Sequence, residues 1–281
     1  MPLPDLIPDA MLTRFRISDP TLIAETAIAR IFKVRRRQGG VAALKHYWRG
    51  HMGNETAGRA VLEAWDGHGV VRVFDHDQAA LLMEWLEGPS LGDLSRQGRD
   101  ACAATELLSV ACHLHRSPVT TSQPLPRLHA WFEGLLGLSF SADCAPQLRH
   151  DMQRAMRVAT ELMAKAVDMH PLHGDLHHDN IRASARGYVA FDAKGLFGDR
   201  AYELANAFRH PADQPDLVRD PRRILSLAEQ WAGGFDVPRE RLLGWAAAKC
   251  ALSIAWRNGT VLRADPEADL LAVLLECSGA P

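Results

Sequence analysis

The eight residues from His173 to Asn180 read His-Gly-Asp-Leu-His-His-Asp-Asn and lie between the apolar residues Leu172 and Ile181. They include three histidines, two aspartates and an asparagine. Burying such groups without partners would cost on the order of several kcal/mol, so we expect them to meet a ligand, a metal ion or one another. Carboxylates and imidazoles suit proton transfer, and both also bind metal ions.

The spacing within this segment narrows the chemistry. His173 stands two residues before Asp175, and Asn180 follows after four intervening residues. Loops that catalyse phosphoryl transfer share this H-x-D-x-x-x-x-N pattern, in which the aspartate accepts the hydroxyl proton and the asparagine oxygen helps to hold Mg²⁺. We therefore predict Asp175 as the general base and Asn180 as a metal ligand. His173 is predicted to brace the loop by hydrogen bonding, the alternative being a purely structural histidine.

A second candidate metal ligand follows the strand predicted over residues 188–191. Asp192 begins the sequence Asp-Ala-Lys-Gly, and its carboxylate is predicted to complete the Mg²⁺ site and link the ion to the nucleotide phosphates. Lys194 comes two residues later. We predict that it directs positive charge toward the transferred phosphoryl group, the alternative being an outward-pointing side chain.

Two charged residues in the N-terminal part are candidates for binding the phosphates of the nucleotide. Lys45 ends the apolar run Val-Ala-Ala-Leu-Lys, and a strand lysine that faces a cleft supplies a compact cation for the α- and β-phosphates of a nucleotide. Glu55, in the first turn of the helix predicted next, is the expected partner that orients the ammonium group. Taken singly, each residue also fits a plain surface charge.

A connector follows the last N-terminal strand. The run Leu81–Gly88 is apolar at first and ends in Glu-Gly. We predict that backbone groups of Glu84 and Leu86 bind an adenine edge, which is compatible with a simple linker between two lobes.

The surrounding pattern predicts the elements that position these residues. Strands are expected over 28–34 and 41–47 around a Gln-Gly-Gly turn, then a helix with Asn54 as its N-cap, then strands over 70–74 and 79–85. Ser90 and Asp93 resemble a capping box. Helical periodicity dominates thereafter, with helices predicted over Asp100–Arg116, Leu128–Leu136, Pro146–Met169, Arg200–Arg209, Pro221–Ala232 and Pro238–Asn258.

This ordered set of motifs, together with Gly-Asp-Arg-Ala-Tyr-Glu-Leu-Ala from Gly198, resembles the aminoglycoside phosphotransferase superfamily over nearly the whole chain. Within it, residues 172–180 together with 191–195 resemble the branch of streptomycin 6-phosphotransferases and hydroxyurea phosphotransferases. The resemblance implies an α+β, protein-kinase-like two-lobed fold, with a small N-terminal antiparallel sheet plus one helix (1–87) and a larger, mainly helical C-terminal lobe (88–281). It also implies transfer of the γ-phosphoryl group of ATP to a hydroxyl of an aminoglycoside or related small molecule. One departure is the phosphate loop expected at 24–29, which has no glycine.

The composition argues against several other classes of protein. The net charge is −2, with 32 basic and 34 acidic residues, so no nucleic-acid or membrane partner is expected. No apolar run approaches the roughly 20 residues that a membrane helix needs, and residues 1–5 lack a signal-peptide pattern. The five cysteines are scattered and odd in number, which is typical of reduced thiols. We expect a cytoplasmic protein that is a monomer or weak dimer.

Several alternatives stay open. Kinases of homoserine, choline or sugars would show many of the same motifs. A metal-dependent hydrolase would instead bind Zn²⁺ or a two-metal centre through a set drawn from His173, His177, His178, Asp179 and Asp192. A catalytically idle pseudokinase is the third alternative. The acceptor itself is not specified, although Asp93, Asp213, Asp216 and Asp220 are candidates to bind a cationic one.

Overall fold

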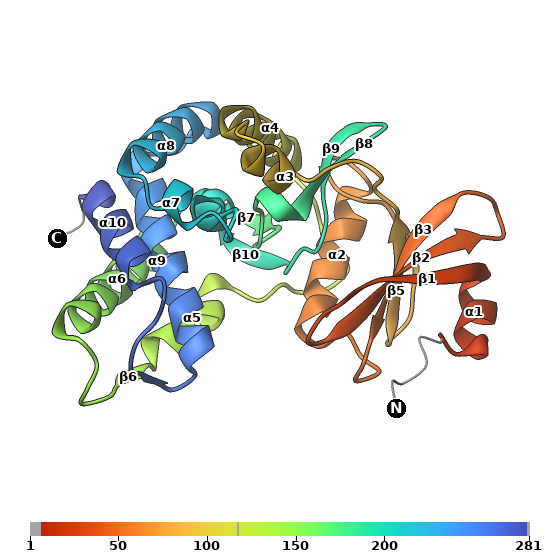
Figure 1. The fold of residues 1–281 in the computed structure, drawn as a ribbon, viewed down its shortest axis with the longest axis horizontal. Helices are drawn as coiled ribbons and strands as arrows, with labels where there is room; N and C mark the ends of the chain where they lie inside the picture. Colours follow the sequence, from red (N-terminus) through yellow and green to blue (C-terminus); the bar gives the residue numbers. More distant parts are fainter. Residues whose placement is uncertain (1–6, 117, 280–281) are drawn as a thin grey trace.

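The computed structural model describes residues 7–116 and 118–279, so the N-terminal segment used above to argue against a signal peptide lies outside the described residues. Figure 1 shows a strand-rich N-terminal lobe and a larger helical lobe. The sheet is antiparallel, and the predicted α+β two-lobed fold is therefore confirmed. The boundary between residues 87 and 88 stays a prediction.

The N-terminal sheet has five strands in the order β1-β2-β3-β5-β4. The predicted hairpin is present, and Gly39 and Gly40 at its turn both adopt positive φ angles, which glycine tolerates at no steric cost. The last two strands begin up to three residues later than the sequence pattern indicated. The strands are β1 (Ile17–Glu25), β2 (Ala29–Arg36), β3 (Val41–Tyr47), β4 (Val73–His76) and β5 (Ala80–Glu84).

Strand β1 and the helix before it, α1 (Asp9–Phe15), were not predicted. Strand β1 contains Pro20, two register shifts and mostly exposed or half-buried residues, so it lacks the alternation that identifies a strand. The predicted Asn54 cap is wrong. Asn54 lies within the 3₁₀ turn η1 (Gly53–Glu55), and helix α2 (Thr56–Trp65) begins one residue later than predicted, without a side-chain cap.

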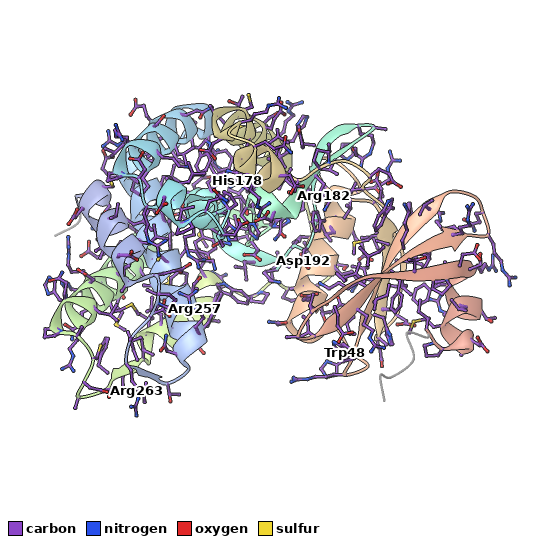
Figure 2. All side chains as sticks on the ribbon, viewed as in Figure 1. Trp48, His178, Arg182, Asp192, Arg257 and Arg263 are labelled. Atoms are coloured by element: carbon purple, nitrogen blue, oxygen red, sulfur yellow. The ribbon has the colours of Figure 1, made fainter. Side chains whose placement is uncertain are left out.

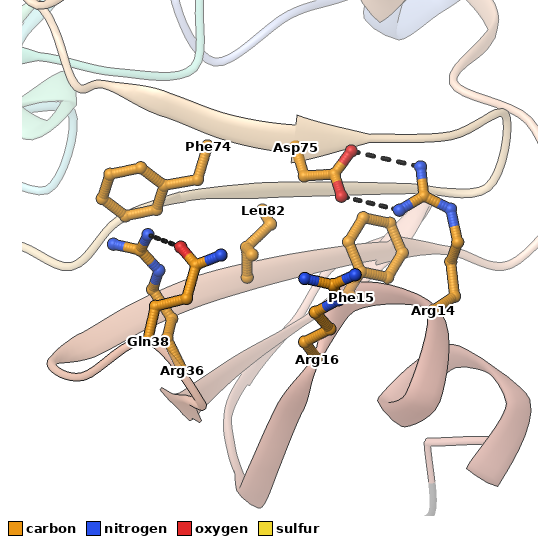
Figure 3. A pocket seen from close by; sticks show the side chains of 8 residues that line it. All are labelled: Arg14, Phe15, Arg16, Arg36, Gln38, Phe74, Asp75 and Leu82. Atoms are coloured by element: carbon orange, nitrogen blue, oxygen red, sulfur yellow. Dashed lines mark hydrogen bonds and ion pairs between the residues drawn. The ribbon is translucent and has the colours of Figure 1, made fainter.

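Alternation along β3 and β5 gives the sheet two different faces. Lys45, Leu81 and Met83 line a small cavity toward α2, whereas Leu44 and Leu82 pack in a second cluster that includes Phe15 of α1. That outer face also holds a pocket of about 250 Å³ (Figure 3), which the paired Arg14 and Asp75 help to line. The outer pocket and the residues predicted to do chemistry therefore lie on opposite faces of the sheet.

The helical lobe packs around α9, which carries a continuous run of buried residues from Leu242 to Ala255. The capping box predicted at Ser90 and Asp93 is present at the start of α3. None of the helices in the described part of the chain is long and apolar enough to cross a bilayer. The helices are α3 (Leu91–Arg96), α4 (Asp100–Leu114), α5 (Leu128–Leu136), α6 (Pro146–Ala164), α7 (Pro215–Val218), α8 (Pro221–Phe235), α9 (Arg239–Asn258) and α10 (Ala268–Ser278).

Short strands frame the segment that carries the catalytic motif. Strand β7 (Met169–Leu172) pairs antiparallel with β10 (Leu196–Asp199), and β8 (Ile181–Ser184) pairs with β9 (Gly187–Ala190). Strand β9 lies within one residue of the strand predicted over 188–191. The β7–β10 pair was not predicted, and Met169, the last residue of the predicted helix 146–169, begins β7 instead. After β10 comes η3 (Arg200–Arg209), a 3₁₀ helix where a regular α-helix was expected. Two further short strands, β6 (Ser139–Phe140) and β11 (Val261–Leu262), pair at the edge of the lobe.

Candidate active site

The loop after β7 presents Asp175 as a half-buried carboxylate. Its Oδ1 accepts a hydrogen bond from Nδ2 of Asn206 at 2.9 Å, and its backbone carbonyl accepts one from Nδ2 of Asn180 at 3.1 Å. The chain turns into η2 (His178–Asn180) directly afterwards. Side-chain amides of Asn206 and Asn180 thus hold both the carboxylate and the backbone of Asp175, an arrangement that suits its predicted role.

Glu203, in η3, anchors the backbone of this loop. Its two carboxylate oxygens accept hydrogen bonds from the backbone N–H groups of His173 (2.9 Å) and Gly174 (3.0 Å), and Nε2 of His115 donates a third bond at 2.8 Å. Burial by itself would raise the pKa of Glu203, but the His115 hydrogen bond and charge, together with the other donors, bring that pKa below its usual value. The loop therefore rests on an ionised carboxylate inside the lobe.

His173 connects the loop to the strand that precedes Asp192. The side chain is fully buried, and its Nε2 donates to the backbone carbonyl of Phe191 at 3.0 Å. Burial lowers the pKa of His173 despite the opposing pull of Glu203 and Asp175, so the imidazole is neutral near pH 7. This geometry fits the predicted bracing role and keeps the ring away from solvent.

Lys45, Glu55 and Asp192 form a compact ion cluster between the lobes, where Figure 2 shows Asp192. The Nζ atom of Lys45 lies 2.5 Å from Oε2 of Glu55 and 2.6 Å from Oδ1 of Asp192. Lys194 reaches the same cluster, with its Nζ 3.4 Å from Oε1 of Glu55 and 4.0 Å from Oδ2 of Asp192. Burial raises the pKa of Asp192, but the charges of Lys45 and Lys194 outweigh it and the pKa falls below its ordinary value. Lys194 therefore points into the site and not outward.

Two glycines permit this cluster to form. A Cβ atom on Gly58 of α2 would lie 1.8 Å from the carbonyl oxygen of Ala193, and one on Gly195 would lie 2.2 Å from the carbonyl oxygen of Ala57. Gly195 also has φ +69°, which disfavours other residues. The final glycine of Asp-Ala-Lys-Gly is thus explained by direct backbone contact between the Asp192 turn and the helix that follows Glu55.

Asn180 and Asp192 are suitable ligands for a hard divalent cation. Because the Asn180 amide nitrogen is used by the Asp175 carbonyl, its side-chain oxygen is left as the group available to an ion. The backbone N–H of Phe191 donates to the carbonyl of Asn180 at 2.9 Å, so the two segments run together. Amide and carboxylate oxygens are what Mg²⁺ prefers, and the residues present fit that ion.

The connector after β5 and the phosphate loop at 24–29 differ from the pattern expected of a kinase. The N–H of Glu84 donates to the carbonyl of Arg72 at 2.9 Å, and its side chain pairs with Arg186 at 2.6 Å. The N–H of Glu84 is therefore already paired, and adenine binding by the backbone of Glu84 and Leu86 stays a prediction. At 24–29 the hydroxyl of Thr26 accepts the N–H of Ala29 at 3.0 Å, so a threonine closes the β1–β2 turn where other kinase loops use glycine.

The three histidines of the hydrolase alternative have separate surroundings in the structure. His173 and His177 are not on one helix, since the helical turn begins only at His178. The ring of His177 stacks on His210, with centroids 3.7 Å apart and an interplanar angle of 14°. His177, Asp179 and His210 are close enough to share an ion, and His210 Nδ1 lies 3.5 Å from Oδ2 of Asp179. Asp179 is already paired with Arg96 at 2.8 Å.

Sequence reasoning missed the residues that hold the loop. Glu203, Asn206 and Arg209 lie three apart in an otherwise apolar stretch, and that repeated spacing of polar groups was the available signal. Among the acidic residues suggested for a cationic acceptor, three have structural partners. Asp93 closes the capping box, Asp213 pairs with Arg96 and Asp220 caps α8.

Comparison with known proteins identifies the family of the chain. Residues 14–260 match the model of the family described as aminoglycoside/hydroxyurea antibiotic resistance kinase. A streptomycin 3''-kinase of Klebsiella pneumoniae is 36% identical over 79% of this chain and 82% of its own length, and a streptomycin 6-kinase of Streptomyces glaucescens is 28% identical over 97% and 89%. The solved structure of amicoumacin kinase hAmiN with AMP-PNP, Ca²⁺ and Ami has a TM-score of 0.60 at 14% identity, covering 96% of this chain and 92% of that one. The chain belongs to the aminoglycoside/hydroxyurea antibiotic resistance kinase family.

Proposed function

We propose that this kinase uses ATP and Mg²⁺ to phosphorylate a hydroxyl of an aminoglycoside of the streptomycin type. The observation that carries the proposal is the Asp175 carboxylate, held by Asn206 at 2.9 Å in the same loop as Asn180. Opposite it, Lys45 is oriented by Glu55 at 2.5 Å. A base, a metal ligand and a phosphate-binding cation therefore converge between the lobes.

Each residue has one task in this scheme. Asp175 accepts the proton as the acceptor hydroxyl oxygen bonds to the γ-phosphorus, while the bond from that phosphorus to the β–γ bridging oxygen breaks and ADP leaves. Lys45 binds the α- and β-phosphates, and Asn180 and Asp192 would hold Mg²⁺. The ion supplies charge neutralisation for the phosphates when bound. Lys194 adds positive charge beside Asp192 and favours the developing charge on the transferred group.

The choice of acceptor rests on similarity. Proteins named streptomycin kinases align over most of the chain, and a hydroxyurea phosphotransferase of Kitasatospora aureofaciens is 30% identical over 94% of it. Hydroxyurea is therefore the second candidate acceptor. We further propose a cytoplasmic monomer or weak dimer whose lobes meet after residue 87; size-exclusion chromatography with light scattering tests the oligomeric state.

The test is ATP consumption with streptomycin, hydroxyurea and a panel of amino-alcohols and sugars, in the wild type and in Asp175→Asn. Loss of the base should lower kcat by about 10²–10⁴, with ATP affinity unchanged because Asp175 contacts the acceptor side. Asp143→Asn, an exposed aspartate remote from the loop, is the control and should behave as wild type. Full activity of Asp175→Asn would exclude Asp175 as base, and turnover of another acceptor class alone would exclude the aminoglycoside.

A further inference from the structure

The 3₁₀ helix η3 presents three polar side chains along one edge. In 3₁₀ geometry residues three apart eclipse one another, so Glu203, Asn206 and Arg209 share that edge. All three are buried, with exposed fractions of 1%, 5% and 7%. Their partners follow the order of the catalytic loop, because Glu203 binds the backbone of residues 173 and 174 and Asn206 binds the side chain of residue 175.

Arg209 holds the oxygen of the Asn206 side-chain amide. Its Oδ1 accepts a hydrogen bond from Nη1 of Arg209 at 2.7 Å, which fixes the amide so that its Nδ2 points at Asp175. Arg209 is itself clamped by Glu267, with its Nη2 2.7 Å from Oε2. Arg257, at the end of α9, binds the same Glu267 oxygen at 2.8 Å. An amide that might otherwise rotate therefore has one orientation.

We propose that Asn206 is a positioning residue that sets the rotamer of Asp175, and that the Arg209–Glu267 ion pair fixes Asn206 for this purpose. The inference rests on the proposed function, since it takes Asp175 as the base. Asn206 does not touch ATP or the acceptor in this scheme. It aims one carboxylate oxygen by binding the other, so that the free oxygen faces the incoming hydroxyl.

Two substitutions at Asn206 separate positioning from mere support. Asn206→Ala removes both hydrogen bonds. Asn206→Asp keeps the shape and still accepts from Arg209 but has no donor for Asp175. A misaimed base lowers the rate by about 10²-fold, so both variants should lose about that factor in kcat, with the KM for ATP within about threefold of wild type. If Asn206→Asp retains wild-type kcat while Asn206→Ala does not, Asn206 only supports Arg209 and the proposal is wrong.

A double-mutant cycle with Asp175→Asn tests whether the effect passes through Asp175. Asn206→Ala should change kcat less than about threefold in the Asp175→Asn background, and a further loss of about 10²-fold there would refute the proposal. If Asp175→Asn alone keeps full activity, the proposed function fails instead. The acceptor in these assays is streptomycin, or whichever panel compound is turned over.

A control and a structural measurement complete the test. Arg219 also binds the start of α10 and the residues before it, through Asp269 at 2.7 Å and the carbonyl of Pro266 at 2.8 Å. Because these contacts do not include Asn206 or Asp175, Arg219→Ala should leave kcat unchanged. A crystal structure of Asn206→Asp should show Asp175 in a different rotamer, independently of any turnover. An Asp175 side chain that stays in place would overturn the proposal.

Discussion

Glu203→Ala should destabilise the protein more than any change at an exposed carboxylate. The substitution leaves three buried donors without an acceptor, namely the N–H groups of His173 and Gly174 and the Nε2–H of His115. Each unsatisfied buried donor costs about 1–3 kcal/mol. Because water can enter the space left by the side chain, we expect a loss in the lower part of the summed range, about 3–5 kcal/mol, which is also typical when one member of a buried ion pair is removed.

That loss would be a large part of a total stability of about 5–15 kcal/mol. At roughly 2–4 °C per kcal/mol for a chain of this size, Tm should fall by about 10 °C. Urea unfolding monitored by tryptophan fluorescence gives the free energy directly, with an unchanged m-value as the check that both variants unfold from the same state. Glu203→Gln, which keeps one acceptor oxygen, should lose about half as much.

Glu161→Gln is the matched control, because Glu161 forms an exposed i,i+4 pair with Lys165. Such pairs contribute about 0.3–0.5 kcal/mol. The folded fraction of Glu203→Gln should also show a lower kcat, since the backbone of residues 173 and 174 loses its anchor. If Glu203→Ala unfolds within 0.5 kcal/mol of wild type, at the limit expected of a surface change, the loop is not held by this carboxylate.

Two further predictions concern buried groups elsewhere in the chain. Burial lowers the pKa of Lys249 to about 8 from its ordinary 10.5. Between pH 8 and pH 10.5 the unfolded chain therefore keeps the Lys249 proton, whereas the folded chain has lost it. The free energy of unfolding should rise with pH across that window by about 3 kcal/mol. Lys249→Met should abolish this rise and stabilise the protein at pH 7 by a similar amount, as measured by urea unfolding at several pH values; a variant less stable than wild type at pH 7 would contradict it. Gly58→Ala should push α2 away from the Ala193 carbonyl and lower both stability, by about 1–3 kcal/mol, and kcat/KM. Gly233→Ala, in a helix where a Cβ meets no atom within 4 Å, should instead stabilise by about 0.5–1 kcal/mol, and equal effects of the two substitutions would refute the packing argument.

The sequence predicted the parts of the molecule in which local pattern and structure agree. Strand β3 has the predicted bounds, and Lys45 meets Glu55 as expected, because a lysine buried on an apolar strand needs a carboxylate partner. Strand β1 was missed since its edge position leaves it mostly exposed and irregular. The β7–β10 pair was missed for a different reason. Its strands are four residues long and lie at opposite ends of the catalytic segment, so only tertiary contacts define them.

The geometry of η3 was the harder error and the more informative one. Its buried positions suit either helix type, so hydrophobic periodicity could not separate them. Runs of 3₁₀ helix longer than about four residues are uncommon because their hydrogen bonds are poorly aligned, yet η3 spans ten residues.

The contacts of η3 give a reason for this geometry. In an α-helix each step of three residues rotates by roughly 300°, so Arg209 would lie about 120° around the axis from Glu203, and Asn206 would lie halfway between them. One straight edge could not then hold the loop backbone, aim Asp175 and reach Glu267 at once. The less stable helix type is compatible with the fold because the backbone of the catalytic loop, the Asp175 side chain and Glu267 all bind that single edge.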